Sequence, residues 1–212
     1  MSASRVLVSA GPTREYVDPV RYLSNESSGR MGFAIASAAA QAGHLVTLVA
    51  GPVHQPTPAG VRRIDVVSAL DMLAALEHEL PTADALFMAA AVADYRPAVR
   101  HAGKWKAKEA GGEARIDLVE NPDILATLAQ VPGDRMVVGF ALETSDGERR
   151  ALAKMERKRT DYIVLNGASA LNAAVTTVTI LGRDGSRVVH EDKAKEWVAQ
   201  RLIDLKAIRR RD

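Results

Sequence analysis

Lysines at regular spacing are the first features of this 212-residue sequence that could do chemistry. Lys104, Lys106 and Lys108 are two residues apart, so in an extended strand their ammonium groups would lie on one face. Lys154 and Lys158 are four residues apart and would be neighbours on a helix, where like charges cost about 0.2–0.5 kcal/mol. A bound polyphosphate would offset the repulsion in both places. Spacing alone leaves an alternative open, because solvated lysines also occur on surface helices and protect exposed strand edges.

A second candidate is the segment SAGPTREYVDPVRYLSNESSGRMG, which joins an apolar run to a helix expected to open at about Gly32. Its glycines, Gly11 and Gly29 among them, permit close approach of the backbone to a ligand. Ser27 and Ser28 can donate hydrogen bonds at a helix N-terminus, where anions are favoured. The segment contains neither G-x-G-x-x-G nor a P-loop. An ordinary N-cap is the alternative, but a loop of about 20 residues without periodicity favours a function.

The stretch AAAVADYRP combines small residues with a carboxylate. Asp94 could bind a ribose hydroxyl, a base amine or a metal, or it could cap a turn before Pro97. It follows the end of an apolar run that contains Ala89, Ala90 and Ala91. Their small side chains leave room for a flat group to lie against the backbone.

The elements that would position these residues alternate between strands and helices. The strand-like runs are RVLVSA, LVTLVAGP, ADALFMAAAVAD, MVVGFALE and YIVLN, and helical patterns separate most of them. This alternation predicts an α/β fold with a Rossmann-like, doubly wound parallel sheet flanked by helices. Ligands of such sheets bind beyond the carboxyl ends of the strands, near the reversal of strand order. Because the candidate residues follow strand ends, we expect them to meet at that edge.

Capping signals set some helix boundaries. Ser68 and Asp71 form a capping-box pattern before the helix SALDMLAALEHEL. In NPDILATLAQ, Asn121 is the expected N-cap and Pro122 lies in the first turn. A closing amphipathic helix is expected over residues 192–210.

Two segments break the alternation and read as hairpins. KWKAKEAGGEARIDL is expected to turn at Gly111-Gly112, and TTVTILGRDGSRVV at Asp184-Gly185. The prediction is therefore a single domain over residues 1–212, with a flap hairpin at about 99–118 and a second hairpin at about 175–190.

Composition narrows the class of protein. The net charge of +2, from 28 Lys and Arg against 26 Asp and Glu, gives no support for binding to nucleic acid. With no cysteine, disulfides, thiolate metal sites and thiol nucleophiles are excluded. No apolar run reaches the roughly 18 residues of a membrane span, and no signal core is present, so we expect no membrane association and a cytoplasmic protein.

Taken in order, these motifs resemble the phosphopantothenate–cysteine ligase family, in its bacterial CTP-using branch. The most specific matches are AGPTRE-x-x-DPVRYLSN-x-SSGRMGFA, AAAVADYRP, the lysine hairpin, NPDIL and GFALET. The resemblance implies ligation of 4′-phosphopantothenate to L-cysteine through an acyl-cytidylate, in coenzyme A biosynthesis. It also implies a homodimer whose hairpins reach the partner, and a stand-alone enzyme without flavin.

By the same resemblance, Asn25 would hold the acyl-nucleotide and Lys104 would close over the triphosphate from the flap. Magnesium would arrive with CTP, because no His/Asp/Glu set has metal-ligand spacing. The substrate side would involve Gly11, Arg21, Ser27 and Ser28. The CTP-binding residues would be Ala89, Ala90, Ala91, Asp94, Asn121, Pro122, Asp123, Ile124, Phe140, Lys154 and Lys158.

Departures from the family pattern occur at three places. Arg30 stands where the family often has Lys, Ala107 interrupts the lysine hairpin, and the loop ALNAAVTT has Leu171 and Thr176 in place of an aromatic residue and Asn. Two other functions remain as alternatives. A nicotinamide-dependent reductase would need a glycine fingerprint that AGPTREYVDP lacks, and a nucleotide-binding module could keep the fold without the chemistry.

Overall fold

In the computed structural model, the described residues are 3–106, 115–143, 146–167 and 175–205. Their central feature is an eight-stranded sheet in the order β12-β11-β10-β9-β6-β1-β4-β5. The strands from β10 to β5 are parallel to one another, and β11 runs antiparallel to both of its neighbours, β10 and β12. The strands are β1 (Arg5–Ala10), β4 (Leu45–Ala50), β5 (Val61–Asp65), β6 (Ala85–Met88), β9 (Met136–Glu143), β10 (Tyr162–Gly167), β11 (Val175–Gly182) and β12 (Arg187–Ala194).

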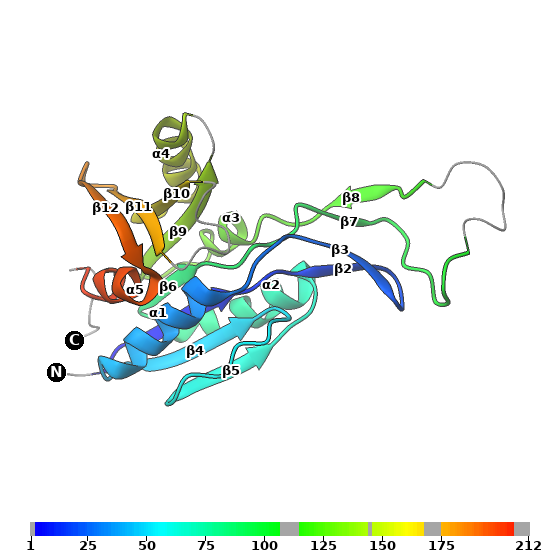
Figure 1. Ribbon diagram of the computed structural model, residues 1–212, viewed down its shortest axis with the longest axis horizontal. Coiled ribbons are helices and arrows are strands. Elements are labelled where there is room, and N and C mark those ends of the chain that lie inside the picture. The colour runs from blue at the N-terminus through cyan, green and yellow to red at the C-terminus, as the bar shows by residue number, and fades with distance from the viewer. Residues whose placement is uncertain (1–2, 107–114, 144–145, 168–174, 206–212) are drawn as a thin grey trace.

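Helices cover both faces of the sheet, as the doubly wound prediction requires (Figure 1). Successive residues of a strand point to opposite faces, so Val6 and Val8 pack with one set of helices and Leu7 with the other. The first set is α1 (Arg30–Gln41) and α5 (Lys195–Ile203), which contact each other. The opposite face is covered by α2 (Ala69–Glu79), which the 3₁₀ turn η1 (Leu80–Thr82) follows, by α3 (Ile124–Leu128) and by α4 (Gly147–Lys158).

Two short antiparallel pairs leave the sheet together and form a projecting arm (Figure 1). One is the hairpin of β2 (Arg14–Asp18) and β3 (Arg21–Ser24), and the other pairs β7 (Tyr95–Pro97) with β8 (Leu118–Glu120). Contacts between β2 and β7 hold the two pairs side by side. The predicted turn at Gly111-Gly112 and Lys108 lie outside the described residues.

Several predicted boundaries were wrong. The glycine- and serine-rich segment after β1 is not an aperiodic loop, because the hairpin β2–β3 occupies much of it. Helix α1 begins at Arg30 rather than Gly32, since Gly29 takes a left-handed conformation with φ 72° and ends the preceding loop. The closing helix begins at Lys195, because residues before it complete the ladder of β12 with β11 up to Ala194.

Side-chain capping sets the starts of helices α2 and α3. The capping box of α2 is confirmed: Ser68 accepts a hydrogen bond from the Asp71 amide, and Asp71 accepts one from the Ser68 amide. The N-cap of α3 is Asp123, which accepts from the Ala126 amide, and not Asn121 as predicted. The Asn121 amide instead donates to the Ala93 carbonyl at 2.9 Å, which ties this segment to the chain after β6.

The carboxyl ends of β1, β4 and β6 are joined by unusually close backbone contacts. Gly51, directly after β4, donates to the Ala10 carbonyl at 2.9 Å. Ala91 donates to the Gly11 carbonyl at 2.9 Å, and Pro12 forms a parallel bridge with Ala91. A Cβ atom on Gly51 would lie 1.8 Å from the Pro12 carbonyl oxygen, so this junction admits no side chain there.

We therefore expect Gly51→Ala to displace Pro12 and to lower the free energy of unfolding by about 1–3 kcal/mol, the usual cost of overpacking. Urea denaturation followed by circular dichroism measures the change. The matched control is Gly103→Ala, where an added Cβ meets nothing within 4 Å. Equal stability of the Gly51 variant and the wild type would contradict the close contact.

Candidate active site

The strand order reverses between β1 and β6. From β1 the chain continues to β4 and β5 on one side, whereas from β6 it continues to β9 and β10 on the other. Such a reversal opens a crevice beyond the carboxyl ends of the two strands. A first cavity of about 640 Å³ lies there, bounded by residues 25–31 of the β3–α1 loop and the start of α1, residues 89–92 after β6, and residues 140–142 of β9.

A second cavity of about 410 Å³ adjoins the first. The two share Ala90, Val92, Asp94, Phe140 and Lys154 in their walls, so they form adjoining parts of one cleft. Residues 120–125 and the end of α4 complete the second cavity.

The cleft brings together most of the predicted site residues from five separate segments. Gly11, Arg21 and Lys104 line neither cavity. The predicted residues that do line the cleft are Asn25, Ser27, Ser28, Ala89, Ala90, Ala91, Asp94, Asn121, Pro122, Asp123, Ile124, Phe140, Lys154 and Lys158.

Asn25 lies at the junction of β3 with the loop before α1. Its side-chain nitrogen donates a hydrogen bond to the Val92 carbonyl at 2.9 Å. The preceding Ser24 hydroxyl donates to the Thr13 carbonyl at 2.7 Å, which holds the end of β3 against the start of β2. A primary amide has two donor hydrogens, so one holds Asn25 on the cleft wall and the other remains for a ligand.

The N-terminus of α1 opens on the first cavity without a side-chain cap. The Gly29 amide donates to the Ser27 hydroxyl at 3.3 Å. A Cβ on Gly29 would lie 3.3 Å from the Gly11 nitrogen, so the two glycine backbones are in contact. Gly11 does not line the cavity, but it packs directly against Gly29, which does.

The two lysines of α4 are both held by protein acceptors. The Lys154 ammonium donates to the Phe140 carbonyl at 2.7 Å. Lys158 is only 5% exposed and forms an ion pair with Asp123. Burial lowers the pKa of Lys158, and the charge of Asp94 acts against that shift. A phosphate at Lys158 would therefore compete with Asp123 for the same ammonium group.

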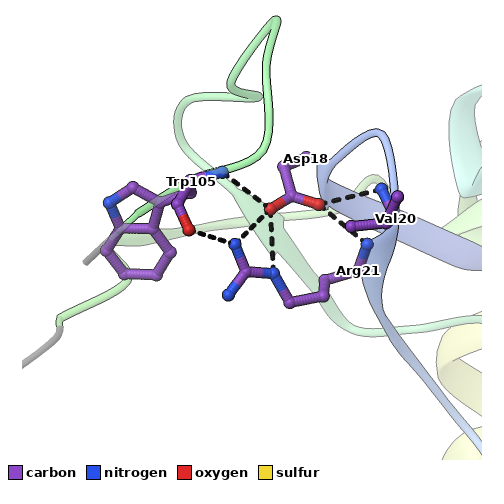
Figure 2. Close-up of polar contacts among 4 residues, drawn as sticks. All are labelled: Asp18, Val20, Arg21 and Trp105. Carbon is purple, nitrogen blue, oxygen red and sulfur yellow. Dashed lines mark hydrogen bonds and ion pairs between the residues drawn. The ribbon is translucent and has the colours of Figure 1, made fainter. Parts of the chain in front are cut away.

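Arg21 and Lys104 belong to the arm, where Asp18 is the organising group (Figure 2). The Asp18 carboxylate is fully buried and accepts from the amides of Val20, Arg21 and Trp105, at 2.9, 2.8 and 3.0 Å. The Arg21 guanidinium pairs with Asp18 and also donates to the Trp105 carbonyl. The bond from Arg21 holds the pKa of Asp18 well below its usual range. The residue after Lys104 is thereby fixed to the turn of the β2–β3 hairpin.

Sequence reasoning missed this role of Asp18 and several residues of the first cavity. An aspartate that precedes Pro and Arg at a turn was a usable signal, because such carboxylates accept from amides two and three residues ahead. Arg30, Asn166, Thr176 and Lys195 also line the first cavity. Lys195 was not recognised because residues 192–210 were predicted to form one helix, which would place Lys195 within its first turns. In the structure, Lys195 is the first residue of α5.

Comparison with known proteins identifies the family. The sequence model of the DNA/pantothenate metabolism flavoprotein C-terminal domain matches residues 1–208. The chain belongs to this family. It is 47% identical over 186 residues to the coenzyme A biosynthesis bifunctional protein CoaBC of Vibrio cholerae, and 44% identical over 205 residues to that of Escherichia coli K12. These alignments include 85% and 94% of this chain but 47% and 50% of the relatives, so the chain spans about half their length.

Solved structures of the family share the fold. The crystal structure of the C-terminal domain of CoaBC superposes with a TM-score of 0.83 at 35% identity, over 96% of this chain and 94% of that one. A Cab2 mutant in complex with phosphopantothenate-cysteine has a TM-score of 0.80 over 96% of this chain and 86% of that one. At 15% identity, this second likeness concerns the fold alone.

Two kinds of feature are absent from the described part of the chain. No group of three His, Cys, Asp or Glu side chains there could hold a metal ion. No helix in the same part has the length and apolar character needed to span a membrane.

We expect Asp18→Asn to lower the melting temperature at pH 7, because the buried amide can no longer pair with Arg21. Since the pKa of Asp18 is depressed in the fold, its stabilising effect is present above the ordinary value of 3.8 and is lost as the pH falls below it. The difference in melting temperature between variant and wild type should therefore narrow in acid. Differential scanning calorimetry across pH tests this.

The control for this experiment is Asp65→Asn. Asp65 also pairs with an arginine, Arg63, but its side chain is 71% exposed, and exposed pairs contribute little. Equal melting of the Asp18 variant and the wild type at pH 7 would contradict the organising role of Asp18.

Proposed function

We propose that this chain joins 4′-phosphopantothenate to L-cysteine in coenzyme A biosynthesis, with CTP converted to CMP and pyrophosphate. The observation that carries the proposal is the convergence of Asn25, Asp94, Lys154, Lys158 and residues 121–124 on one cleft at the reversal of strand order. Identity of 44–47% to CoaBC proteins, which the chain matches over half their length, supports the pathway.

The first step activates a carboxylate. Its oxygen attacks the α-phosphorus of CTP, a bond to phosphorus forms, and pyrophosphate leaves. Because two anions approach each other, the site must supply positive charge. Lys154 and Lys158, which lie on the cleft wall, would supply two cations, and Lys104 would add a third from the arm. Magnesium would enter with the nucleotide, because the described residues offer no metal-binding cluster of their own.

In the second step, the cysteine amine attacks the acyl carbon and CMP leaves. The Asn25 side chain would orient the acyl group through its remaining amide hydrogen, since the first one is bound to Val92. Ala89, Ala90 and Ala91 line the same cavity with small side chains. This step needs no protein nucleophile, in agreement with a chain that has no cysteine.

We further propose a homodimer in which the arm of each subunit contributes side chains to the cleft of its partner. Lys104 and Arg21 do not line the cavities of their own chain. The arm also exposes apolar side chains, with Val20 at 63%, Val99 at 66% and Tyr95 at 53%. Apolar side chains on a projecting element are typical of a surface that another subunit covers.

The first experiment measures pyrophosphate release from CTP in the presence of 4′-phosphopantothenate, and product formation when cysteine is added. We expect Asn25→Ala to release pyrophosphate once but to lose product formation by roughly 100-fold or more, the usual loss for one stabilising donor. The control is Gln130→Ala, which removes an exposed side-chain amide at the end of α3.

The same assay separates the alternatives. A binding module without chemistry would bind CTP and release no pyrophosphate, and replacement of CTP by ATP tests the choice of nucleotide. Release that does not require 4′-phosphopantothenate, or normal turnover of the Asn25 variant, would count against the proposal.

The dimer is tested by complementation. Two differently tagged variants, Asn25→Ala and Lys104→Gln, are co-expressed and the mixed dimer is isolated with both tags. If each arm serves the partner's cleft, one site of the mixed dimer is intact, and we expect about half of the wild-type activity. A mixed dimer of two Asn25→Ala chains is the inactive control. No recovery in the first mixture would mean that the arm does not act across subunits.

A further inference from the structure

Lys195 is a buried lysine on the wall of the first cavity. It is the first residue of α5 and only 9% exposed. Its ammonium group forms no hydrogen bond or ion pair with any residue that the structure describes. It differs in this respect from Lys158, which is also buried but pairs with Asp123.

The protein itself gives little reason for a cation at this position. Burial lowers the pKa of Lys195, the charge of Arg30 lowers it further, and only Glu196 acts in the opposite direction. The N-terminus of α5 carries a partial positive charge that also disfavours a cation in the first turn. A bound anion would act against these effects, because its charge stabilises the ammonium group.

The surroundings of Lys195 suit such an anion. Helix α1 opens on the same cavity through Gly29 and Arg30, and its first turn has no side-chain cap. Ser27 and Ser28 line the cavity beside it. Two helix N-termini, two cations and two hydroxyl groups therefore border one part of the cleft, and uncapped helix N-termini favour phosphate.

We infer that Lys195, with Arg30, binds a phosphoryl group in the first cavity. The inference rests on the proposed function for the source of that group, which is either the polyphosphate of CTP or the phosphate of 4′-phosphopantothenate. The second cavity has the cation Lys158 on its wall, and Lys154 lies on the wall that the two cavities share. A cleft with cations at both ends matches a reaction that brings two phosphorylated molecules together.

Calorimetric titration of Lys195→Met tests the inference. The variant keeps an apolar stem of similar length and removes the charge. The ligands are CTP, inorganic pyrophosphate and 4′-phosphopantothenate, with cytidine and pantothenate as partners that lack phosphate. We expect affinity for a phosphorylated ligand to fall roughly 10- to 100-fold, as for loss of a charged hydrogen bond, and affinity for its unphosphorylated partner to stay the same. The melting temperature should not fall, because a disfavoured buried charge is removed.

The pattern of losses identifies the source. Weaker binding of CTP and pyrophosphate assigns Lys195 to the nucleotide, and weaker binding of 4′-phosphopantothenate alone assigns it to that substrate. The matched control is Lys193→Met. Lys193 is two residues before Lys195, and it is exposed and lies near the Trp197 ring. Its titrations should match the wild type.

Four results would overturn the inference. Three of them are unchanged affinity of Lys195→Met for all three phosphorylated ligands, an equal loss in Lys193→Met, and failure of the wild type to bind any of them. The fourth is a lower melting temperature with an equal loss for every ligand, which would make Lys195 a structural residue. Binding is measured without turnover, so wild-type protein that binds through Lys195 but releases no pyrophosphate would refute the proposed function alone.

Discussion

The backbone of residues 10–13 is enclosed at the carboxyl ends of the central strands, and the cleft takes its shape from that enclosure. Gly51 packs against the Pro12 carbonyl, Gly29 against Gly11, and Gly32 against Ala10, each at a separation that leaves no room for an added Cβ or barely admits one. Hydrogen bonds from Gly51 and Ala91 close the ladder on both sides. Because the ends of three strands and the first turn of α1 meet through backbone atoms, the loops that carry Asn25 and Asp94 start from fixed positions.

Of the residues that the structure describes, three lysines border this cleft, and the fold holds each in a different way. Lys158 has a carboxylate partner, Lys154 has a backbone carbonyl, and Lys195 has neither among the residues described. Lysine ammonium groups lose much of their hydration when buried, so the partner decides how much of that loss is recovered before a ligand arrives. The cleft is therefore not uniformly positive. A ligand at Lys158 meets the Asp123 carboxylate as well as the ammonium group, whereas no carboxylate is paired with Lys195 among the described residues.

The sheet was predictable because its central strands are buried on both faces and are therefore continuously apolar, as in RVLVSA and LVTLVA. Strand β5 was missed, since VRRID lies at the sheet edge and its arginines pair with Glu79 and Asp65 at the surface. The hairpin β2–β3 was missed for a similar reason: its order depends on Asp18, whose partners include Trp105 far along the chain. Motif residues could be assigned to one edge, but the pairing of Lys158 with Asp123 and the burial of Lys195 depend on side-chain packing that no spacing encodes.

Strand β3 is only four residues long, and its two ends make different contacts. At one end Arg21 is bound to Asp18 and to the Trp105 carbonyl, and Asn25 follows directly after the other. Any rearrangement that draws the Lys104 segment away from the hairpin must first break the bonds to Asp18. Four residues therefore separate the Asp18 contacts at the far end of the hairpin from the amide that lies on the cleft wall.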